Sequence, residues 1–325
     1  MTAAALQLDL HPAVEGGLQL EVTDVRPETE DILCITFEDP LGGPLPPFVA
    51  GSHLVVQYGK GANAYSLTGS GDAPSQYSIS VLRCDGGAGG SLAMHGLAVG
   101  DRVNVSRPRS SFAPVANAAH HLLIAAGIGI TPMLSHARYA AEWGGDASLI
   151  YVYRPGAGAH VAEARQLLGE NLTECNGRVR FQEVLAEALT SQKLGTHLYV
   201  CGPDSFMETV LAQARSLGWP KARLHSEAFG AAEFDAGDPF TVSLARSGMK
   251  LEVPSGVSLL EALENVGKTV PNMCRKGICG ECSLTVLRGK PLHRDLYLTD
   301  QEKSENTTMM CCVSRSEDQE LELDL

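Results

Sequence analysis

The chain has 325 residues and a mass of 34.5 kDa, and at about 150 residues per domain this length predicts two or three domains. Its 44% apolar and 19% charged residues are typical of a globular protein and exclude a disordered or collagen-like chain. Lys and Arg number 25 against 38 Asp and Glu, and the formal charge of −13 disfavours nucleic acid and anionic membranes as partners.

Targeting signals and cysteine usage indicate the expected compartment of the protein and the kind of chemistry to expect. The longest apolar stretches, such as residues 121–130, are much shorter than the roughly 20 residues that cross a bilayer, so we expect no membrane span. Residues 1–17 lack the basic and apolar regions of a secretory signal, which predicts a cytoplasmic protein. Nine cysteines, an odd number in a chain this long, favour metal or redox chemistry over a disulfide scaffold.

The first region, from Leu18 to about Pro114, is predicted to be β-structure. Segments rich in β-branched and aromatic residues alternate there with Gly, Pro and Asp clusters. The predicted strands cover residues 20–23, 32–37, 53–58, 76–82 and 102–106. Five or six such strands predict a small closed barrel.

The second region, from about His120 to Phe229, alternates strand-like and helix-like runs, which predicts βαβ crossovers on a parallel sheet. The predicted strands are 122–126, 149–153, 179–184 and 198–201, and the predicted helices are 132–143, 161–168 and 205–217. We expect Asp204 to cap the last helix, and Gly218 with Pro220 to end it.

A stretch of small and polar residues then predicts a linker and a third domain. The third domain is expected to contain a hairpin at 240–244 and 250–253, a helix at 259–266 and a strand at 283–287. The acidic tail, residues 317–325, is interpreted as a solvated edge, with the steering of a basic partner as the alternative. The predicted domains are therefore residues 1–116, 117–230 and 240–325, with a linker at 231–239.

The most specific pattern is a run of cysteines. Cys274, Cys279 and Cys282 have the spacing C-x4-C-x2-C, and Cys312 follows after 29 residues. This is the plant-type ligand spacing of a [2Fe–2S] cluster. Structural zinc is the alternative, although it prefers paired short spacings. Cys311 is next to Cys312, and neighbours on an extended segment point to opposite faces, so only one of the two is expected to bind iron.

Two turns in the second region indicate a dinucleotide site. The segment 125–132 ends a strand and opens a helix, where backbone N–H groups and the helix dipole favour a pyrophosphate. The segment 199–203 does the same, so both loops are expected at one carboxyl edge of the sheet. An ordinary tight turn is the alternative for the first segment alone. The candidate residues are Gly127, Gly129, Thr131, Pro132, Cys201, Gly202 and Pro203.

A third pattern lies in the barrel region. Tyr65 and Ser66 have the chemistry to hold a planar ring, and the glycine-rich turn at 86–91 before a short helix suits a phosphate. A hairpin turn with a core tyrosine is the alternative, and composition alone favours it. The candidate residues are Asn63, Tyr65, Ser66, Leu67, Gly89, Gly90 and Ser91.

In this order, the motifs resemble those of the phthalate dioxygenase reductase family, the single-chain reductases of Rieske-type oxygenases. The resemblance covers nearly the whole chain, and it includes Glu227–Gly230, His293–Asp295 and Cys312–Arg315. It implies a six-stranded antiparallel flavin-binding β-barrel, a nucleotide-binding α/β domain with a parallel sheet, and a C-terminal β-grasp ferredoxin domain.

The resemblance also implies FMN, NADH and a [2Fe–2S] cluster as cofactors. Ser66, Cys201 and Phe229 would be the catalytic residues: Ser66 with Tyr65 at the flavin ring, Cys201 near the nicotinamide, and Phe229 against the flavin. Residues 89–91 would bind the FMN phosphate and residues 127–131 the nucleotide. Cys312 is the preferred fourth ligand because it directly precedes Val-Ser-Arg.

One residue departs from the family pattern. Asn63 stands where the family usually has Arg two residues before the tyrosine. An arginine would give a charged fork, whereas asparagine gives only neutral hydrogen bonds. Flavin affinity is the property that this change affects, and Arg107 or Arg109 is expected to compensate.

The expected activity is hydride transfer from NADH to FMN, followed by single-electron transfer through the cluster to a terminal oxygenase, preferably of the Rieske type. A flavin is required because nicotinamide gives electrons in pairs and the cluster accepts them singly. NADPH is the less expected donor, although Arg154 has the charge to meet a ribose phosphate. The alternatives are a redox sensor and a stand-alone flavin or ferric reductase.

Overall fold

The computed structural model describes residues 17–59, 61–86, 89–110, 112–229, 236–272, 277, 280–295 and 297–325. The chain divides into two compact units, Met1–Phe229 and Gly230–Leu325, and each is described by itself. Within the described ranges, every helix is too short or too polar to cross a membrane.

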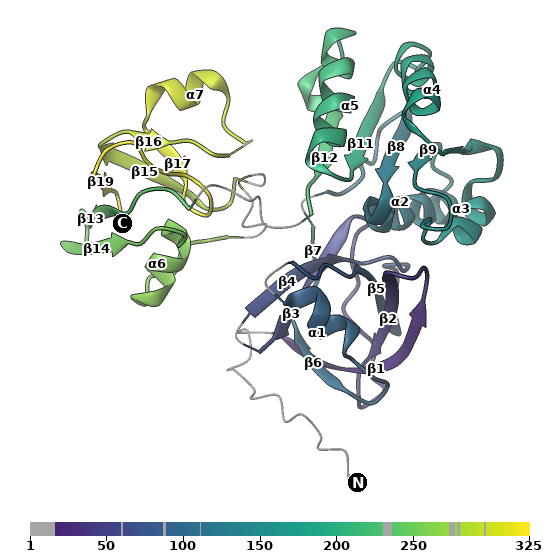
Figure 1. Cartoon of the computed structure of the whole chain (residues 1–325), viewed down its shortest axis with the longest axis horizontal. Helices are drawn as coiled ribbons and strands as arrows, with labels where there is room; N and C mark the ends of the chain where they lie inside the picture. The colour runs from purple at the N-terminus through teal and green to yellow at the C-terminus, as the bar shows by residue number, and fades with distance from the viewer. Residues whose placement is uncertain are drawn as a thin grey trace. The chain divides into compact units, whose positions relative to one another are not determined.

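The first part of unit 1 is an antiparallel β-barrel (Figure 1). Its strands follow the order β4-β3-β6-β1-β2-β5, and β7 pairs with β3. A bridge between Leu67 and Ile79 joins the end of β4 to β5 and closes the sheet. The elements are β1 (Leu18–Pro27), β2 (Ile32–Glu38), β3 (Ser52–Tyr58), β4 (Gly61–Ser66), β5 (Gln76–Leu82), α1 (Gly90–His95), β6 (Arg102–Val105) and β7 (Arg109–Ser110). The prediction of a six-stranded antiparallel barrel is confirmed, and β4 is a strand that the sequence analysis did not predict.

The second part of unit 1 is a parallel sheet with the strand order β10-β9-β8-β11-β12. The order reverses direction at β8, so the crevice at its carboxyl end is the expected ligand site of such a fold. The strands are β8 (His120–Ala126), β9 (Ala147–Val152), β10 (Leu172–Cys175), β11 (Thr196–Cys201) and β12 (Leu224–Glu227). The helices are η1 (Gly127–Gly129), α2 (Ile130–Trp143), α3 (Val161–Leu168), η2 (Gly169–Asn171), α4 (Arg178–Thr190), α5 (Asp204–Ser216) and η3 (Lys221–Arg223).

Helices cover both faces of this sheet. Alternate strand residues point to opposite faces, so Leu123 packs with α2 and α3, while Leu122 and Ile124 pack with α4 and α5. The α2 and α3 face also packs against Ile32 and Phe112. The barrel therefore lies against the side of the sheet that carries α2, the helix that follows the first nucleotide loop.

Two predictions in this part are wrong. The predicted strand 179–184 is part of α4, and the strand after α3 is β10. Helical spacing places four apolar side chains on the buried face of α4: Phe181, Val184, Leu185 and Leu189. Asp204 does not cap α5, because Pro203 occupies the cap position and Asp204 is the first helical residue.

Unit 2 is a mixed sheet with the order β14-β13-β19-β15-β17, packed against α6. The predicted hairpin, helix and strand are all present. The strands are β13 (Phe240–Leu244), β14 (Met249–Val253), β15 (Ser283–Arg288), β16 (Pro291–Leu292), β17 (Thr308–Met310), β18 (Arg315–Ser316) and β19 (Glu320–Leu323), and the helices are α6 (Leu259–Asn265) and α7 (Asp300–Glu305). A capping box of Ser258 and Glu261 starts α6.

The acidic tail is not a solvated edge. Its strand β19 lies inside the sheet, parallel to β13 and antiparallel to β15. Leu321 and Leu323 are 0% exposed, while Glu320 and Glu322, which alternate with them, point away from the core. The alternation of leucine with Glu and Asp is therefore that of a strand buried on one face.

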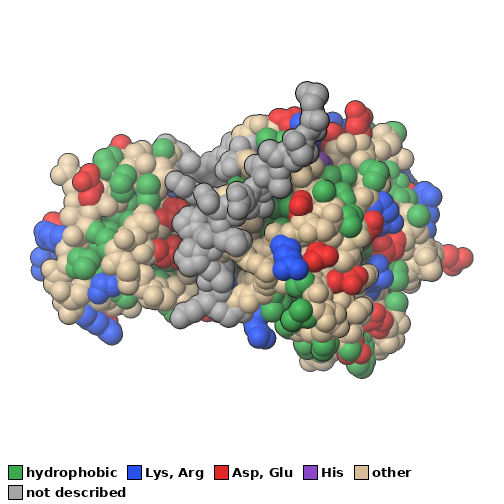
Figure 2. Space-filling view, turned by 90° about the horizontal axis from the view of Figure 1, so that it is seen from below, with side chains coloured by type: hydrophobic (Ala, Val, Ile, Leu, Met, Phe, Trp, Pro, Cys, Tyr) green, Lys and Arg blue, Asp and Glu red, His purple; other side chains and the backbone are tan. Residues whose placement is uncertain are grey.

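Charged side chains of both signs are interspersed on the face of the molecule that Figure 2 shows. In unit 2, oppositely charged side chains form ion pairs, for example Lys250 with Glu320 and Arg246 with Asp324. Pairs as exposed as these contribute little to stability because water screens them. The fold therefore depends mainly on its apolar cores.

We predict that Leu323→Ala destabilises unit 2 by about 2–5 kcal/mol, because it leaves a cavity beside β13 and β15. Hydrogen exchange of backbone amides in residues 240–272, measured over a urea series, reports this free energy. Leu287→Ala is the matched control, since Leu287 is 54% exposed on β15. Equal effects of the two substitutions would contradict the buried position of β19.

Candidate functional site

The two predicted nucleotide loops lie side by side at the carboxyl edge of the parallel sheet. Ala125 of β8 pairs with Cys201 of β11, so the loops leave neighbouring strands. A Cβ on Gly129 would lie 2.2 Å from the Cys201 carbonyl oxygen and 2.9 Å from the Gly202 nitrogen. No larger residue fits at 129 without moving the loops apart. The two loops are therefore adjacent at one edge of the sheet, as expected.

Local contacts hold the first loop in shape. The Tyr151 hydroxyl donates to the Gly127 carbonyl (3.1 Å), and the Thr131 hydroxyl donates to the Ile128 carbonyl (3.1 Å). Thr131 is 2% exposed, so its hydroxyl stabilises the turn from inside. Pro132 is the third residue of α2, where its missing N–H breaks no helical hydrogen bond.

Two histidines near these strands have structural roles. His136 donates from Nε2 to the Phe112 carbonyl (2.8 Å), and the ring of His225 stacks on Tyr199. Burial lowers the pKa of His136 to about 3, and burial, followed by the repulsion of His197, lowers that of His225 to about 4. Both imidazoles are therefore neutral at pH 7.

In the barrel, the predicted flavin residues gather around the start of α1. The Asn63 amide donates to the Tyr65 hydroxyl (3.5 Å), and a Cβ on Gly90 would lie 2.2 Å from the Asn63 Nδ2 atom. Gly89 precedes α1 with a φ of +89°, a conformation that favours glycine. Burial raises the pKa of Tyr65, while the Asn63 hydrogen bond acts in the opposite direction.

Two residues of this group have contacts that the sequence did not predict. The Ser91 hydroxyl accepts from the Cys84 N–H (3.0 Å) and donates to the Cys84 carbonyl (3.2 Å), which ties α1 to the segment after β5. The Leu67 side chain is 0% exposed and belongs to the barrel core. At Leu67 only the backbone is left to face a ligand.

Strand β4 of the barrel and the parallel sheet meet through Ser66, the last residue of β4. Its hydroxyl donates to Oε2 of Glu227 (3.2 Å), the last residue of β12, and Ser66 is 5% exposed. Phe229, two residues further on, packs against the apolar cluster on the α2 face of the sheet. Glu227 is a residue that the sequence analysis quoted as part of a motif without assigning it a role.

The cysteines of unit 2 approach one another as a ligand set would. Sγ of Cys282 lies 3.0 Å from Sγ of Cys312, and the Gly277 N–H donates to the Cys312 sulfur (3.3 Å). Cys311 is 0% exposed in the core, and its N–H donates to the Cys282 carbonyl. The other two predicted ligands, Cys274 and Cys279, lie outside the described residues.

A buried carboxylate supports the loop around these thiols. Asp295 is 2% exposed and accepts from the Leu298 N–H (2.8 Å) and the Ser314 hydroxyl (3.3 Å). A Cβ on Gly277 would lie 2.9 Å from the Cα of Asp295. The loop is thus packed closely around the sulfur atoms of Cys282 and Cys312, and an N–H group points at the second of them. This arrangement fits a thiolate-bound iron–sulfur cluster.

Two models of known families match this chain, one in each of its two compact units. Residues 104–224 match the model of the dimethylamine monooxygenase subunit DmmA-like N-terminal domain. Residues 242–317 match the model of the 2Fe-2S iron-sulfur cluster binding domain.

Relatives of nearly the same length cover almost the entire chain. The beta subunit of the heme-dependent oxidative N-demethylase of Ectopseudomonas mendocina (strain ymp) is 44% identical over 95% of this chain and 99% of its own. Phthalate dioxygenase reductase of Burkholderia cepacia is 36% identical over 97% of this chain and 99% of its own. A solved structure of phthalate dioxygenase reductase, described as modular for electron transfer from pyridine nucleotides to [2Fe–2S], has a TM-score of 0.77 with 36% identity and covers 96% of this chain and 98% of its own.

We predict that Gly129→Ala weakens NADH binding about tenfold or more. The added Cβ forces the loops apart, and overpacking of this kind costs about 1–3 kcal/mol, with about 1.4 kcal/mol for each tenfold. Titration of the oxidised protein with NAD⁺ or with a non-reducing NADH analogue measures the change. In the control, Gly69→Ala, the added Cβ meets no atom within 4 Å. An unchanged affinity in Gly129→Ala would contradict the proposed crevice.

Cys311 and Cys312 provide a matched pair for the fourth ligand. We predict that Cys312→Ser loses bound iron and acid-labile sulfide, while Cys311→Ser keeps both and unfolds at a lower temperature because it buries a hydroxyl in the core. Iron and sulfide analysis of the two purified variants measures this difference. The reverse result would assign the cluster to Cys311.

Proposed function

Because this chain belongs to the phthalate dioxygenase reductase family, we propose that it is the NADH-dependent reductase component of a multicomponent oxygenase or demethylase. It is an oxidoreductase with a flavin-reductase fold and a [2Fe–2S] ferredoxin domain. The observation that carries the proposal is the hydrogen bond from Ser66 to Glu227, since it joins the flavin strand to the end of the nucleotide sheet.

The proposed chemistry assigns two tasks to unit 1. FMN, when bound, supplies the conversion between a hydride and single electrons. Tyr65 and Ser66 would bind its ring, and the start of α1 with Asn63 would bind its phosphate. The neutral Asn63 amide supports this assignment of the phosphate site, because it lies beside Gly90 at the start of α1. Arg107 or Arg109 would supply the positive charge that the missing arginine gives in the family.

The carboxyl edge of the sheet would hold the donor nucleotide. Gly127–Thr131 and Cys201–Pro203 offer backbone donors at the start of α2 and α5, which suits a pyrophosphate. Cys201 is 0% exposed and ends β11, so it would lie beside the nicotinamide, with Phe229 on the flavin side. NADH is the proposed donor, and Arg154 is the charge that would serve NADPH.

In unit 2, Cys274, Cys279, Cys282 and Cys312 would bind the cluster. We assign the flavin domain to residues 1–116, the nucleotide domain to 117–230, the linker to 231–239 and the ferredoxin domain to 240–325. The end of β7 at Ser110 and the start of β8 at His120 support the first boundary.

The partner of such a reductase subunit is an oxygenase. We propose a Rieske-type oxygenase as one candidate. A heme-dependent amine N-demethylase is the second, and two similarities favour it: the 44% identical relative and the dimethylamine monooxygenase family model. Coupling tests separate the two, because the reduced chain should support formaldehyde release from a methylamine with one class of oxygenase and not with the other.

We predict that the wild-type chain reduces cytochrome c rapidly with NADH and that Cys279→Ser loses this activity, while NADH still bleaches the bound flavin. The cluster is the single-electron outlet in this proposal, so its loss blocks only the last transfer. Stopped-flow absorbance of flavin and cytochrome c measures both steps, with Cys84→Ser, at an exposed cysteine, as the control.

Two other results would replace the proposal. Full cytochrome c reduction by Cys279→Ser would indicate a stand-alone flavin or ferric reductase. Slow turnover of the wild type with every acceptor, together with a partner whose binding changes on reduction, would indicate a redox sensor.

A further inference from the structure

A polar junction joins the barrel to the nucleotide domain within unit 1, through residues that are not among the predicted ligand residues. We call it the domain junction. The barrel contributes the side chains of Glu28 and Ser80 and the carbonyl of Thr68, and the nucleotide domain contributes Arg138, His160 and Glu163. None of these six residues was singled out from the sequence.

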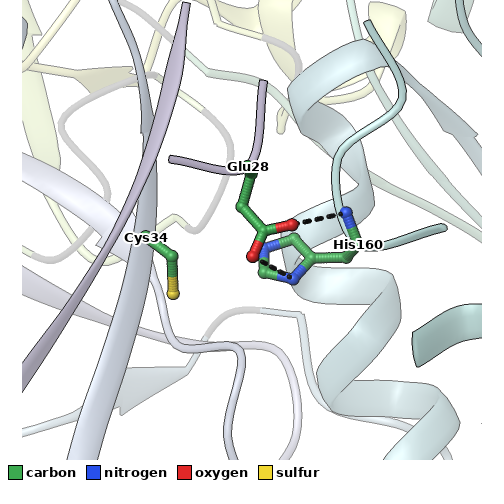
Figure 3. A group of neighbouring side chains, drawn as sticks. All are labelled: Glu28, Cys34 and His160. Carbon is green, nitrogen blue, oxygen red and sulfur yellow. Dashed lines mark hydrogen bonds and ion pairs between the residues drawn. The ribbon is translucent and has the colours of Figure 1, made fainter. Parts of the chain in front are cut away.

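His160 makes four contacts in the junction, two with Glu28, one with Ser80 and one with Glu163. Its backbone N–H donates to Oε2 of Glu28 (3.0 Å), and its Nδ1 atom lies 3.6 Å from Oε1 of the same carboxylate (Figure 3). Its Nε2 atom is 2.7 Å from the Ser80 hydroxyl. The imidazole is 3% exposed and the Glu28 side chain 12%, so these interactions are shielded from water and correspondingly stronger.

Arg138 makes the second link. Its Nε atom donates to the Thr68 carbonyl (3.0 Å), and its NH2 group is paired with Glu163, which also faces Nδ1 of His160 at 3.4 Å. A guanidinium donates along fixed directions, so holding two acceptors at once fixes an angle as well as a distance. The two links are therefore connected through Glu163.

The position of Arg138 connects this junction to the proposed active site. It lies on α2, the helix that begins at Ile130 directly after the first nucleotide loop. Thr68 lies two residues after Ser66 on the flavin side. One side chain thus joins the helix that starts at the nucleotide loop to the segment that follows the flavin strand.

Glu28, Cys34 and His160 are also of the kinds that bind zinc, and their ligand atoms lie within 4.8 Å of one another (Figure 3). The surrounding contacts favour an ion-pair junction instead. The Ser80 hydroxyl is hydrogen-bonded to Nε2 of His160, and the Arg26 guanidinium is 2.8 Å from the Glu28 carboxylate. A hydrogen bond with Cys34, followed by the charge of Glu28, raises the pKa of Arg26, so a positive charge already occupies this place.

We infer that Arg138 and His160 are positioning residues, which hold the nucleotide domain against the flavin barrel at the separation that hydride transfer needs. This inference rests on the proposed function. Hydride transfer requires reacting atoms about 3–3.5 Å apart, and a misplacement of about 1 Å costs about a hundredfold in rate. A contact that fixes the two domains therefore acts on the rate of transfer rather than on nucleotide affinity.

The test is Arg138→Met, which keeps an unbranched side chain and removes both hydrogen bonds. Anaerobic stopped-flow of the purified full-length protein, loaded with flavin and cluster, separates NADH binding from flavin reduction. We expect the hydride-transfer rate constant to fall by about tenfold or more, while the dissociation constant for NADH stays within about twofold. His160→Gln, which keeps a partner for Ser80 and loses the contacts of Nδ1, should show a smaller fall of the same kind.

Arg165→Met is the matched control, because Arg165 also lies on a helix of the nucleotide domain but pairs with Glu174 of the same domain. It should leave the hydride-transfer rate unchanged. The inference fails if Arg138→Met transfers hydride at the wild-type rate, or if it loses NADH affinity in proportion to its activity. Failure of the proposed function is a different result, in which the wild-type flavin itself is not reduced by NADH.

An absorption measurement that does not depend on the folding stability of the variants completes the test. If the domains are displaced, the long-wavelength charge-transfer absorption between nicotinamide and flavin should weaken in Arg138→Met at saturating NADH and persist in Arg165→Met. Metal analysis of the wild type provides the opposing outcome. One zinc per chain, lost in Cys34→Ser and retained in Cys84→Ser, would overturn the ion-pair junction in favour of a metal site.

Discussion

The proposed nucleotide site depends on the gap between two neighbouring strand ends. Parallel strands lie about 4.8 Å apart, and the register that pairs Ala125 with Cys201 brings the turns after β8 and β11 to the same level. With 2.2 Å between a Cβ at 129 and the Cys201 carbonyl oxygen, only glycine keeps both turns at the sheet edge. The direction of α2, and with it the position of Arg138, follows from that turn.

Local patterns predicted most elements of the fold, because a helix or strand that buries one face leaves a periodic trace in the sequence. Two of the errors occurred where a second property of the sequence competed with its hydrophobic period. In the C-terminal strand, the acidic residues suggested a solvated edge, although Leu321 and Leu323 alternate with them. In residues 179–184, a short apolar run fitted a strand, and only the longer spacing to Leu189 identifies the helix.

The candidate site, too, has a part that the sequence predicts and a part that it does not. The cysteine motif could be predicted because three of its ligands lie within nine residues, where spacing alone carries the chemistry. Ser66 and Glu227 are 161 residues apart, and Arg138 and Thr68 are 70 apart. Such contacts depend on how two domains pack, and one of the partners is a backbone carbonyl that any residue type supplies. These contacts between domains therefore cannot be predicted from residue types and their spacing.

The division of the chain at Phe229 matches the physical demands of the two kinds of electron transfer. A hydride moves only between atoms in near contact, so flavin and nicotinamide sites must belong to one body whose internal geometry is fixed. The buried contacts of Ser66, Arg138 and His160 all lie within unit 1 and meet this demand. A single electron does not need its donor and acceptor atoms to touch, so a separate compact unit is sufficient to carry the cluster. The boundary between the units thus separates the part of the chain for hydride transfer, which needs atomic contact, from the part for single-electron transfer, which does not.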